Sequence, residues 1–362
     1  MILKTFGWSF AVTIIALVGA LILGGPTALA LVAILSVLEV SLSFDNAVVN
    51  ATILEKMSAF WQKIFLTIGI IVAVFGMRLV FPLLLVGITA KIGPVDAVRL
   101  ALEGGSIHEP GTYAYLLHEA HPAIASFGGM FLLMLFLDFV FEDREIAWLT
   151  WLERPLAKIG RLDQLPVVVA LVLLAIAGEV LAEEPETVLF SGVLGVVTYL
   201  LVNGLGELFE GVGGADDADG QAGGDGGPNG VAKATGKAAF FLFLYLEVLD
   251  ASFSFDGVIG AFAITQDIFI IAVGLGVGAM YIRSITVFLV RKGTLSNYVY
   301  LEHGAMWAIG ALAIILLISI KHEVPEMVTG LIGVGFILLA FGSSVVRNRR
   351  LPQEEKETVA VG

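Results

Sequence analysis

The chain has 362 residues, of which 58% are hydrophobic and 15% charged, and its formal net charge is −13. Soluble domains carry about a quarter charged residues, and apolar segments long enough to cross a bilayer recur along this chain, so we expect a polytopic membrane protein. The absence of cysteine excludes disulfides, thiolate metal sites and cysteine nucleophiles. No basic patch with interleaved aromatic residues occurs, and we expect no nucleic-acid partner.

Apolar segments in chain order predict an all-α protein with about ten transmembrane helices, surrounded by the lipid bilayer. The predicted spans are roughly 7–24, 27–50, 64–88, 123–141, 166–182, 186–209, 238–263, 267–290, 299–320 and 325–346. The first span follows Lys4 like the apolar part of a signal peptide, but no A-x-A-type cleavage site comes after it. We therefore expect a retained first helix.

Lysine and arginine are distributed unevenly between the two sides of the predicted membrane. Fifteen of the 20 fall on the side of the two termini, three fall on the other side, and Arg78 and Arg283 lie inside spans. Because basic residues concentrate on the cytoplasmic side, this pattern predicts that both termini are cytoplasmic.

Four parts of the chain follow from these spans. They are a first membrane half (1–210) with an outer loop at about 91–122, a flexible Gly/Asp-rich cytoplasmic linker (211–237), a second membrane half (238–346) and a cytoplasmic tail (347–362). The linker superficially resembles a calcium-binding loop, but it lacks the first and last ligands of an EF-hand, at Ala215 and Gly226. A Gly-rich linker is the expected reading.

A ten-residue acidic pattern occurs twice, as L-E-V-S-L-S-F-D-N-A at 38–47 and as L-D-A-S-F-S-F-D-G-V at 249–258. At an offset of 211, Glu39 falls on Asp250 and Asp45 falls on Asp256. The span after each copy holds one arginine, Arg78 or Arg283. Five spans separate equivalent helices, and an odd number reverses their direction, so we expect two inverted repeats with a substrate site between them.

Charged side chains inside a membrane are costly and are by default candidates for a functional site. At about 100° per residue, Glu39, Ser43 and Asn46 share one face of a helix, whereas Asp45 lies about 120° from Glu39. The second copy repeats this arrangement, so the acids converge only if the backbone unwinds near Asp45 and Asp256. Gly257 and Gly260 favour such unwinding in the second copy.

The side chains of the two motifs offer hard oxygen ligands, which suit Mg²⁺, Ca²⁺ or Mn²⁺ better than copper or zinc. The candidate metal ligands are Glu39, Asp45, Asn46, Asp250 and Asp256, with Ser43, Glu247 and Ser254 as additional candidates. Arg78 and Arg283 are the expected counter-ions. The structural alternative is that the acids pair with these two arginines simply to lock helices together.

Other polar residues are weaker candidates. His118 and His121 in the outer loop flank Glu119 and are candidates for capturing cations, although a solvated loop is the more common explanation for such residues. Their spacing does not fit the zinc-protease H-E-x-x-H pattern. Asp138, Glu302 and His303 are expected near the membrane interface.

The two motifs, each followed by a span with an intramembrane arginine, resemble the TerC family of bacterial integral membrane proteins, and more specifically an uncharacterised TerC-like branch. The resemblance covers most of spans 2–4 and 7–9. It implies manganese export and metal homeostasis, with an association with tellurite resistance, and metal-handling roles for Glu39, Asp45, Asn46, Asp250 and Asp256. The chain departs from the family where Asp250 replaces Glu, where Gly257 stands at the position of Asn46, and in its His-bearing outer insertion.

Two functions of different classes follow. The first is ion transport by a divalent metal-ion transporter, a manganese exporter with its acidic site between the repeats and with the ion as substrate rather than as a bound cofactor. The second is a membrane scaffold or assembly factor in a stress-response or secretion complex, whose protein partners the sequence does not identify. No arrangement of a nucleophile with a base indicates an enzyme.

Overall fold

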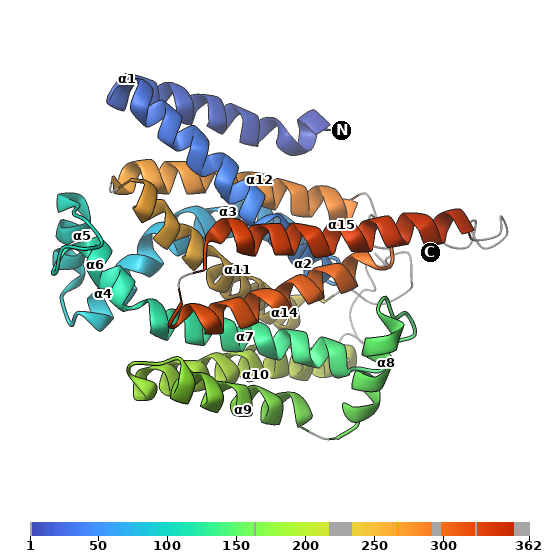
Figure 1. Ribbon diagram of the computed structural model, residues 1–362. Helices are drawn as coiled ribbons and strands as arrows, with labels where there is room; N and C mark the ends of the chain where they lie inside the picture. Colours follow the sequence, from blue (N-terminus) through green and yellow to red (C-terminus); the bar gives the residue numbers. More distant parts are fainter. Residues whose placement is uncertain are drawn as a thin grey trace.

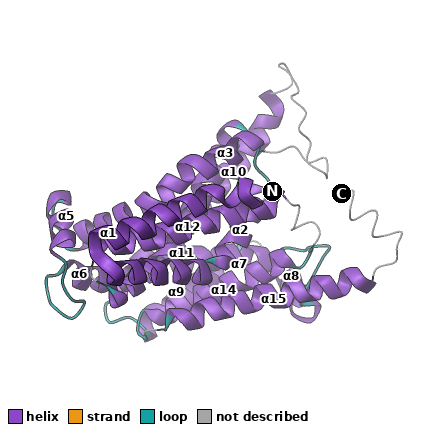
Figure 2. Ribbon diagram, turned by 90° about the horizontal axis from the view of Figure 1, so that it is seen from above, coloured by secondary structure: helices purple, strands orange, loops and turns teal. Residues whose placement is uncertain are grey.

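A computed structural model describes residues 2–162, 164–216, 234–265, 267–291, 298–322 and 324–350. Within these ranges the chain is helical, with no strand beyond one isolated bridge between Met57 and Ala234 (Figures 1 and 2). The helices are α1 (Ile2–Leu42), α2 (Phe44–Leu54), α3 (Ala59–Ile71), the π-helix η1 (Val72–Val80), α4 (Phe81–Thr89), α5 (Pro94–Glu103), α6 (Tyr113–Glu119), α7 (His121–Phe141), α8 (Thr150–Ile159), α9 (Leu165–Val180), α10 (Pro185–Asp216), α11 (Gly236–Ile264), α12 (Ile268–Arg291), α14 (Leu301–Ser319) and α15 (Glu326–Arg350).

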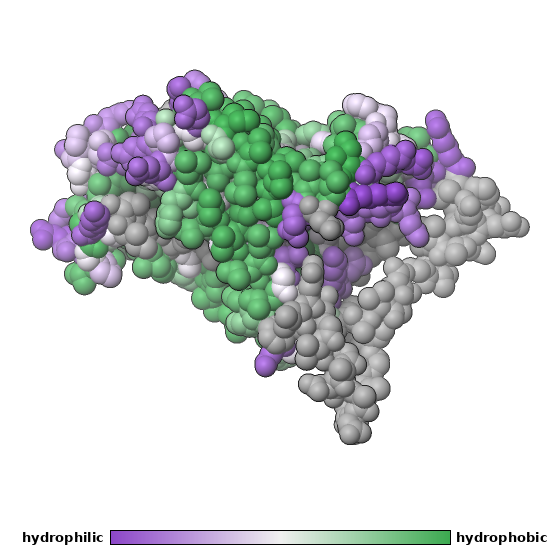
Figure 3. All heavy atoms as spheres, turned by 90° about the horizontal axis from the view of Figure 1, so that it is seen from below, coloured by the Kyte–Doolittle hydropathy of each residue, from purple (hydrophilic) through white to green (hydrophobic). Residues whose placement is uncertain are grey.

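Seven helical segments in the described part of the chain are long and apolar enough to cross a membrane. They are Thr5–Val40, Ala59–Leu84, His121–Phe141, Pro185–Leu205, Ile268–Val290, Leu301–Ser319 and Met327–Arg350, with Leu165–Val180 as a shorter apolar helix. A hydrophobic band crosses the molecule between hydrophilic ends (Figure 3). The protein is therefore a membrane-embedded helical protein, as its composition predicts.

The first helix is divided where the sequence predicts the boundary between two spans. The spans expected at 7–24 and 27–50 meet at a kink in α1, at Gly25 (φ 72°, ψ −167°), and the second arm continues into α2. Glycine adopts this positive φ without steric cost, and Pro26 supplies no backbone N–H to a helix running through the kink. The two arms of α1 fold back on each other at this point (Figure 1).

The core of the bundle lies around α7, which packs between α10 and α14. Glycines let the helices approach closely here. A Cβ atom at Gly310 of α14 would lie 2.7 Å from the ring of Phe136, and one at Gly129 of α7 would lie 3.3 Å from the carbonyl oxygen of Ala313. α1 packs mainly along α12, so it lies beside the second membrane half rather than beside its own.

The two ends of the bundle carry different segments. The N-terminus, the end of α15 and α8 lie at one end, and α5 and α6 lie at the other (Figure 1). The predicted outer loop at 91–122 is thus not a plain loop, because Pro94 starts one helix at its N1 position and Thr112 caps the next through Tyr115 N–H (3.2 Å).

The boundaries of the predicted linker and tail also shift. α10 continues through the first six residues of the predicted linker, to Asp216, and α11 begins at Gly236. The rest of that prediction, 217–233, lies outside the described residues. The tail predicted at 347–362 is helical as far as Arg350, the end of α15, and 351–362 also lie outside the described residues.

Candidate functional site

The first acidic motif contains a break in its helix. α1 ends at Leu42, Ser43 has non-helical torsions (φ −101°, ψ 17°), and α2 begins at Phe44. The N–H of Ser43 still donates to the carbonyl of Glu39 (3.0 Å), so the helix axis is interrupted by one residue only. The unwinding expected near Asp45 is therefore present beside it.

The second motif does not unwind. α11 runs without a break from Gly236 to Ile264, so the unwinding expected near Asp256 is wrong. Gly257 and Gly260 tolerate a break but do not require one, because glycine also adopts helical torsions. The two copies of the motif therefore differ in backbone although their sequences align.

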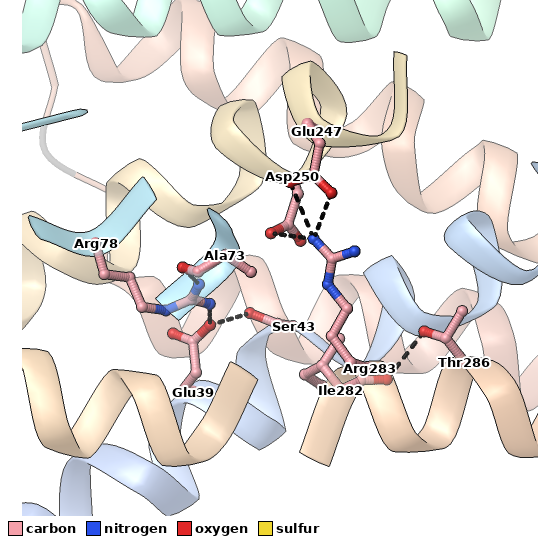
Figure 4. A network of polar contacts seen from close by, with 9 residues as sticks. All are labelled: Glu39, Ser43, Ala73, Arg78, Glu247, Asp250, Ile282, Arg283 and Thr286. Atoms are coloured by element: carbon pink, nitrogen blue, oxygen red, sulfur yellow. Dashed lines mark hydrogen bonds and ion pairs between the residues drawn. The ribbon is translucent and has the colours of Figure 1, made fainter. Parts of the chain in front are cut away.

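Glu39 of the first motif is buried and forms an ion pair with Arg78 (Figure 4). Nη2 of Arg78 donates to Oε1 of Glu39, and Nη1 donates to the carbonyl of Ala73 at 2.6 Å. The hydroxyl of Ser43, at the helix break, donates to the same Glu39 oxygen at 3.1 Å. One carboxylate is thus shared by an arginine from the next membrane segment and a serine from its own.

Arg78 is carried by the π-helix η1, which spans nine residues inside the membrane segment Ala59–Leu84. π-helical turns are rare and occur frequently at functional sites. The hydrogen bond from the Arg78 side chain to the carbonyl of Ala73, five residues earlier, links the guanidinium to the backbone of this segment. A change of helix type here would move Arg78 relative to Glu39.

Glu247 and Asp250 on α11 share Arg283 of α12 (Figure 4). Nη2 of Arg283 lies 3.3 Å from both carboxylate oxygens of Glu247 and 3.3 Å from Oδ2 of Asp250. The guanidinium carbon stacks 3.8 Å from the ring centroid of Phe65 on α3. Two acids against one arginine leave this buried cluster with one net negative charge.

The two clusters use equivalent positions of the two sequence copies. Glu39 and Asp250 align with each other, and each pairs with the arginine of the membrane segment that follows its own motif helix. Both acids and both arginines are at most 4% exposed. The pairing is therefore repeated in the structure as well as in the sequence.

Each cluster also touches the other half of the chain through a glycine. A Cβ atom at Gly257 of α11 would lie 3.1 Å from Oε2 of Glu39, and one at Gly278 of α12 would overlap Cβ and Cγ of Glu39. A Cβ atom at Gly69 of α3 would lie 2.9 Å from Nη1 of Arg283. Charged groups of one half thus occupy space that glycines of the other half leave free.

The structure brings some of the predicted ligands together and leaves others undescribed. Glu39 and Ser43 meet, Glu247 and Asp250 meet, and Asn46 is buried on α2. The side chains of Asp45, Ser254 and Asp256 lie outside the described part. Among the described residues, no group of three or more His, Asp or Glu side chains is arranged to hold a metal ion.

The sequence reading missed Asn50. This residue of α2 is fully buried, and neither atom of its amide has a hydrogen-bond partner among the described residues. Its position four residues after Asn46, on the same face of the helix, was the available signal.

The outer histidines lie near each other. The rings of His118 in α6 and His121 at the start of α7 stack at an interplanar angle of 17°, with centroids 6.5 Å apart. At the opposite end of the bundle, His303 of α14 lies 3.1 Å through Nδ1 from Glu153 of α8. Trp307 Nε1 also donates to Glu153 (2.9 Å), so this buried acid joins α8 to α14.

The chain belongs to a family of proteins of unknown function, DUF475, whose model matches residues 44–351. The comparison with curated proteins gave no match, and neither did the comparison with solved structures. The match covers the second acidic motif, the last four residues of the first motif (Phe44–Ala47) and both intramembrane arginines, and Glu39 lies before it.

Proposed function

We propose that this protein is a divalent-cation transporter of the bacterial inner membrane and exports Mn²⁺. The observation that supports it best is the pair of buried clusters, Glu39 with Arg78 and Asp250 with Arg283, at equivalent positions of two sequence copies. Ionisable residues inside membrane-spanning segments are costly and usually mark a functional site. The resemblance of the two motifs to the TerC family points in the same direction.

The proposed architecture has ten crossings in two inverted repeats. The two arms of α1, the second continuing into α2, the segment α3–η1–α4, and the single helices α7, α9, α10, α11, α12, α14 and α15 supply ten. The positions of the N-terminus and the end of α15 at one end of the bundle are consistent with an even number (Figure 1). The concentration of Lys and Arg assigns that end to the cytoplasm.

In the proposed site the arginines pair with Glu39, Glu247 and Asp250 when no ion is bound. An incoming Mn²⁺ takes over part of the charge of Arg78 and Arg283, and its hard-oxygen preference suits Glu39, Asp45, Asn46, Asp250 and Asp256. The break at Ser43 and the π-helix around Arg78 are the elements that allow the pairs to open. Both lie in the first half, which therefore supplies most of the movement.

A scaffold or assembly factor is the rival proposal. The observation that favours it is that Glu39, Glu247 and Asp250 are all paired with arginine and that no metal-binding group forms among the described residues. On this proposal the arginines lock helices together and the protein moves no ion.

Flux of Mn²⁺ into proteoliposomes tests the transport proposal. The comparison includes the parent, Asp45→Asn, Asp256→Asn and, as a control, Asp143→Asn, an exposed acid at the α8 end of the bundle. We expect flux with the parent and the control and its loss in the other two variants. Flux in both Asp45→Asn and Asp256→Asn at the parental rate would exclude the central site, and no flux with the parent would favour the scaffold.

A thermal-shift series in detergent identifies the ion. A ligand that binds only the folded protein raises its apparent stability, by about 2.7 kcal/mol at one hundred times its dissociation constant. We expect Mn²⁺ to raise the melting temperature more than Mg²⁺, Ca²⁺ or Zn²⁺ at equal concentration. Stabilisation by none of the four would contradict a divalent-ion site.

A further inference from the structure

Asn50 is buried without the partners that a buried amide needs. It is 0% exposed, and its Oδ1 and Nδ2 atoms both lack a hydrogen-bond partner among the described residues. An unsatisfied buried polar group costs about 1–3 kcal/mol, so such groups call for a specific explanation. The second sequence copy places Ala261 at the equivalent position, at the same offset of 211, so the repeat does not require an amide here.

The polar side chains along α2 follow one face of the helix. Asn46 and Asn50 lie four residues apart and Ile53 follows three residues later, so the three share a face. Ser43, which donates to Glu39, stands immediately before the helix. Ser43, Asn46 and Asn50 are all buried, and at 1.5 Å per residue the path from Ser43 to Ile53 is about 15 Å long.

A polar cavity of about 520 Å³ lies at the α8 end of the bundle, and Ile53, at the end of this face, lines it. Asp138 lines it too, and its carboxylate accepts a hydrogen bond from Tyr199 (2.6 Å). Arg144 also lines the cavity and pairs with two further lining acids, Glu142 and Glu302.

The charge of this cavity suits a cation. Three acids line the cavity against two basic residues, Arg144 and Lys56, so its lining carries one net negative charge. Lys56 is exposed to solvent. Asp138 accepts the hydrogen bond of Tyr199, whereas Glu142 and Glu302 pair with Arg144. Carboxylate, hydroxyl and amide oxygens lining one cavity match the ligands preferred by hard divalent cations.

We propose that the cytoplasmic route to the central site runs along α2, with Asn50 as an intermediate position that binds the permeating divalent cation. The ion enters the cavity at Asp138, passes the amide oxygens of Asn50 and Asn46 in turn, and reaches Glu39. This inference rests on the proposed transport function and deepens it, because it names the path and a ligand outside the two motifs. If Asn50 had only a structural role, its unsatisfied amide would lower the free energy of unfolding without any compensating interaction.

The test measures Mn²⁺ flux in proteoliposomes and melting temperature in detergent for Asn50→Leu and Asn50→Asp. Leucine has nearly the shape of asparagine but no oxygen, whereas aspartate keeps an oxygen ligand. Asn348→Leu, on the last turns of α15, is the matched control for the same chemical change. The Mn²⁺-induced rise in melting temperature reports binding at the central site independently of flux.

We expect Asn50→Leu to lose flux by about tenfold or more, because an oxygen ligand along the path is removed. We expect Asn348→Leu to stay within about threefold of the parent, and Asn50→Asp to keep clearly more flux than Asn50→Leu, because aspartate retains an oxygen ligand. Asn50→Leu should melt no lower than the parent and keep its Mn²⁺-induced shift, since the amide has no internal partner to lose.

Three results would overturn the proposal, and they are distinguishable. Parental flux in Asn50→Leu removes the route along α2 and leaves the transport function intact. Equal loss of flux in Asn50→Asp and Asn50→Leu shows that shape rather than an oxygen ligand matters. Absence of Mn²⁺ flux in the parent removes the proposed function and, with it, the route.

Discussion

Oε2 of Glu39 lies against Gly257, the residue that stands in the second motif where Asn46 stands in the first. A Cβ atom at Gly257 would come within 3.1 Å of this oxygen, which is tighter than ordinary van der Waals contact. Gly257 therefore lacks the amide that Asn46 carries in the first motif, and the space that it leaves free lies against the carboxylate of Glu39. The asymmetry between the motifs has a steric reason, because an asparagine at 257 would occupy the space of Glu39.

The buried pair of Glu39 and Arg78 should show strong coupling between its two members. Arg78→Met leaves the carboxylate with Ser43 as its remaining described side-chain partner, and we expect a loss of about 3–5 kcal/mol in the free energy of unfolding. Adding Glu39→Met to this variant removes the uncompensated charge and should restore most of the loss. Denaturant titrations of the parent, both single variants and the double variant in detergent give the coupling energy. Additive losses would mean that the two side chains do not interact.

The close approach of α12 to Glu39 makes Gly278 sensitive to added volume. Gly278→Ala places a methyl group where Cβ and Cγ of Glu39 lie, and we expect a loss of about 1–3 kcal/mol together with a weaker ion pair with Arg78. Gly335→Ala in α15 is the control, because nothing lies within 4 Å of its added Cβ atom. That variant should gain about 0.5–1 kcal/mol, since alanine favours a helix. Equal melting temperatures for the two variants would contradict the packing.

Phe65 should stabilise the second cluster through its ring. The guanidinium of Arg283 stacks 3.8 Å from the ring centroid and both side chains are almost fully buried, so Phe65→Leu should cost about 2 kcal/mol beyond the change in apolar area. Phe60→Leu, whose side chain is 65% exposed on the same helix, is the matched control and should change stability little. Thermal unfolding in one detergent compares the two variants. A similar small loss in both would show that the stacking contributes nothing.

Glu153 should make the attachment of α8 depend on pH. Burial raises the pKa of this carboxyl, but the contact with His303, the hydrogen bond from Trp307 and a backbone N–H together outweigh burial, and the net pKa is lowered from its ordinary value of 4.5. Since the folded pKa is below the unfolded one, the stabilisation is present above pH 4.5 and is lost as the pH falls through the lower folded value.

Melting temperature as a function of pH checks this relationship. Glu153→Gln should lower the melting temperature at neutral pH and should flatten its decline on the acid side. Glu302→Gln, which changes a partly buried partner of Arg144 on the same helix as His303, is the control. The same acid-side decline in Glu153→Gln and the parent would assign that decline to other carboxyls.

The class of this protein and the location of its two acidic motifs follow from the sequence alone. Long apolar segments determine that the chain is embedded in a membrane, and the bilayer then accepts only helices or barrels. The helical periodicity places Glu39 and Ser43 on one face of their helix. Aligning the chain with itself is enough to show that Glu39 is equivalent to Asp250 and that Arg78 is equivalent to Arg283. The kink of α1 at Gly25 falls between the spans predicted at 7–24 and 27–50, whereas hydropathy does not show that the two arms fold back on each other.

The tertiary structure decided which groups meet. It pairs each arginine with the acid of its own half, sets Glu39 against Gly257 and Gly278 of the other half, and buries Asn50 with no hydrogen-bond partner among the described residues. It also breaks one motif helix at Ser43 while leaving α11 continuous, although both motifs align. Such contacts depend on differences of a few tenths of an ångström in the distance between helices that lie far apart in the chain. Composition and periodicity carry no information about those distances, because packing between segments, and not the residues of either segment alone, sets them.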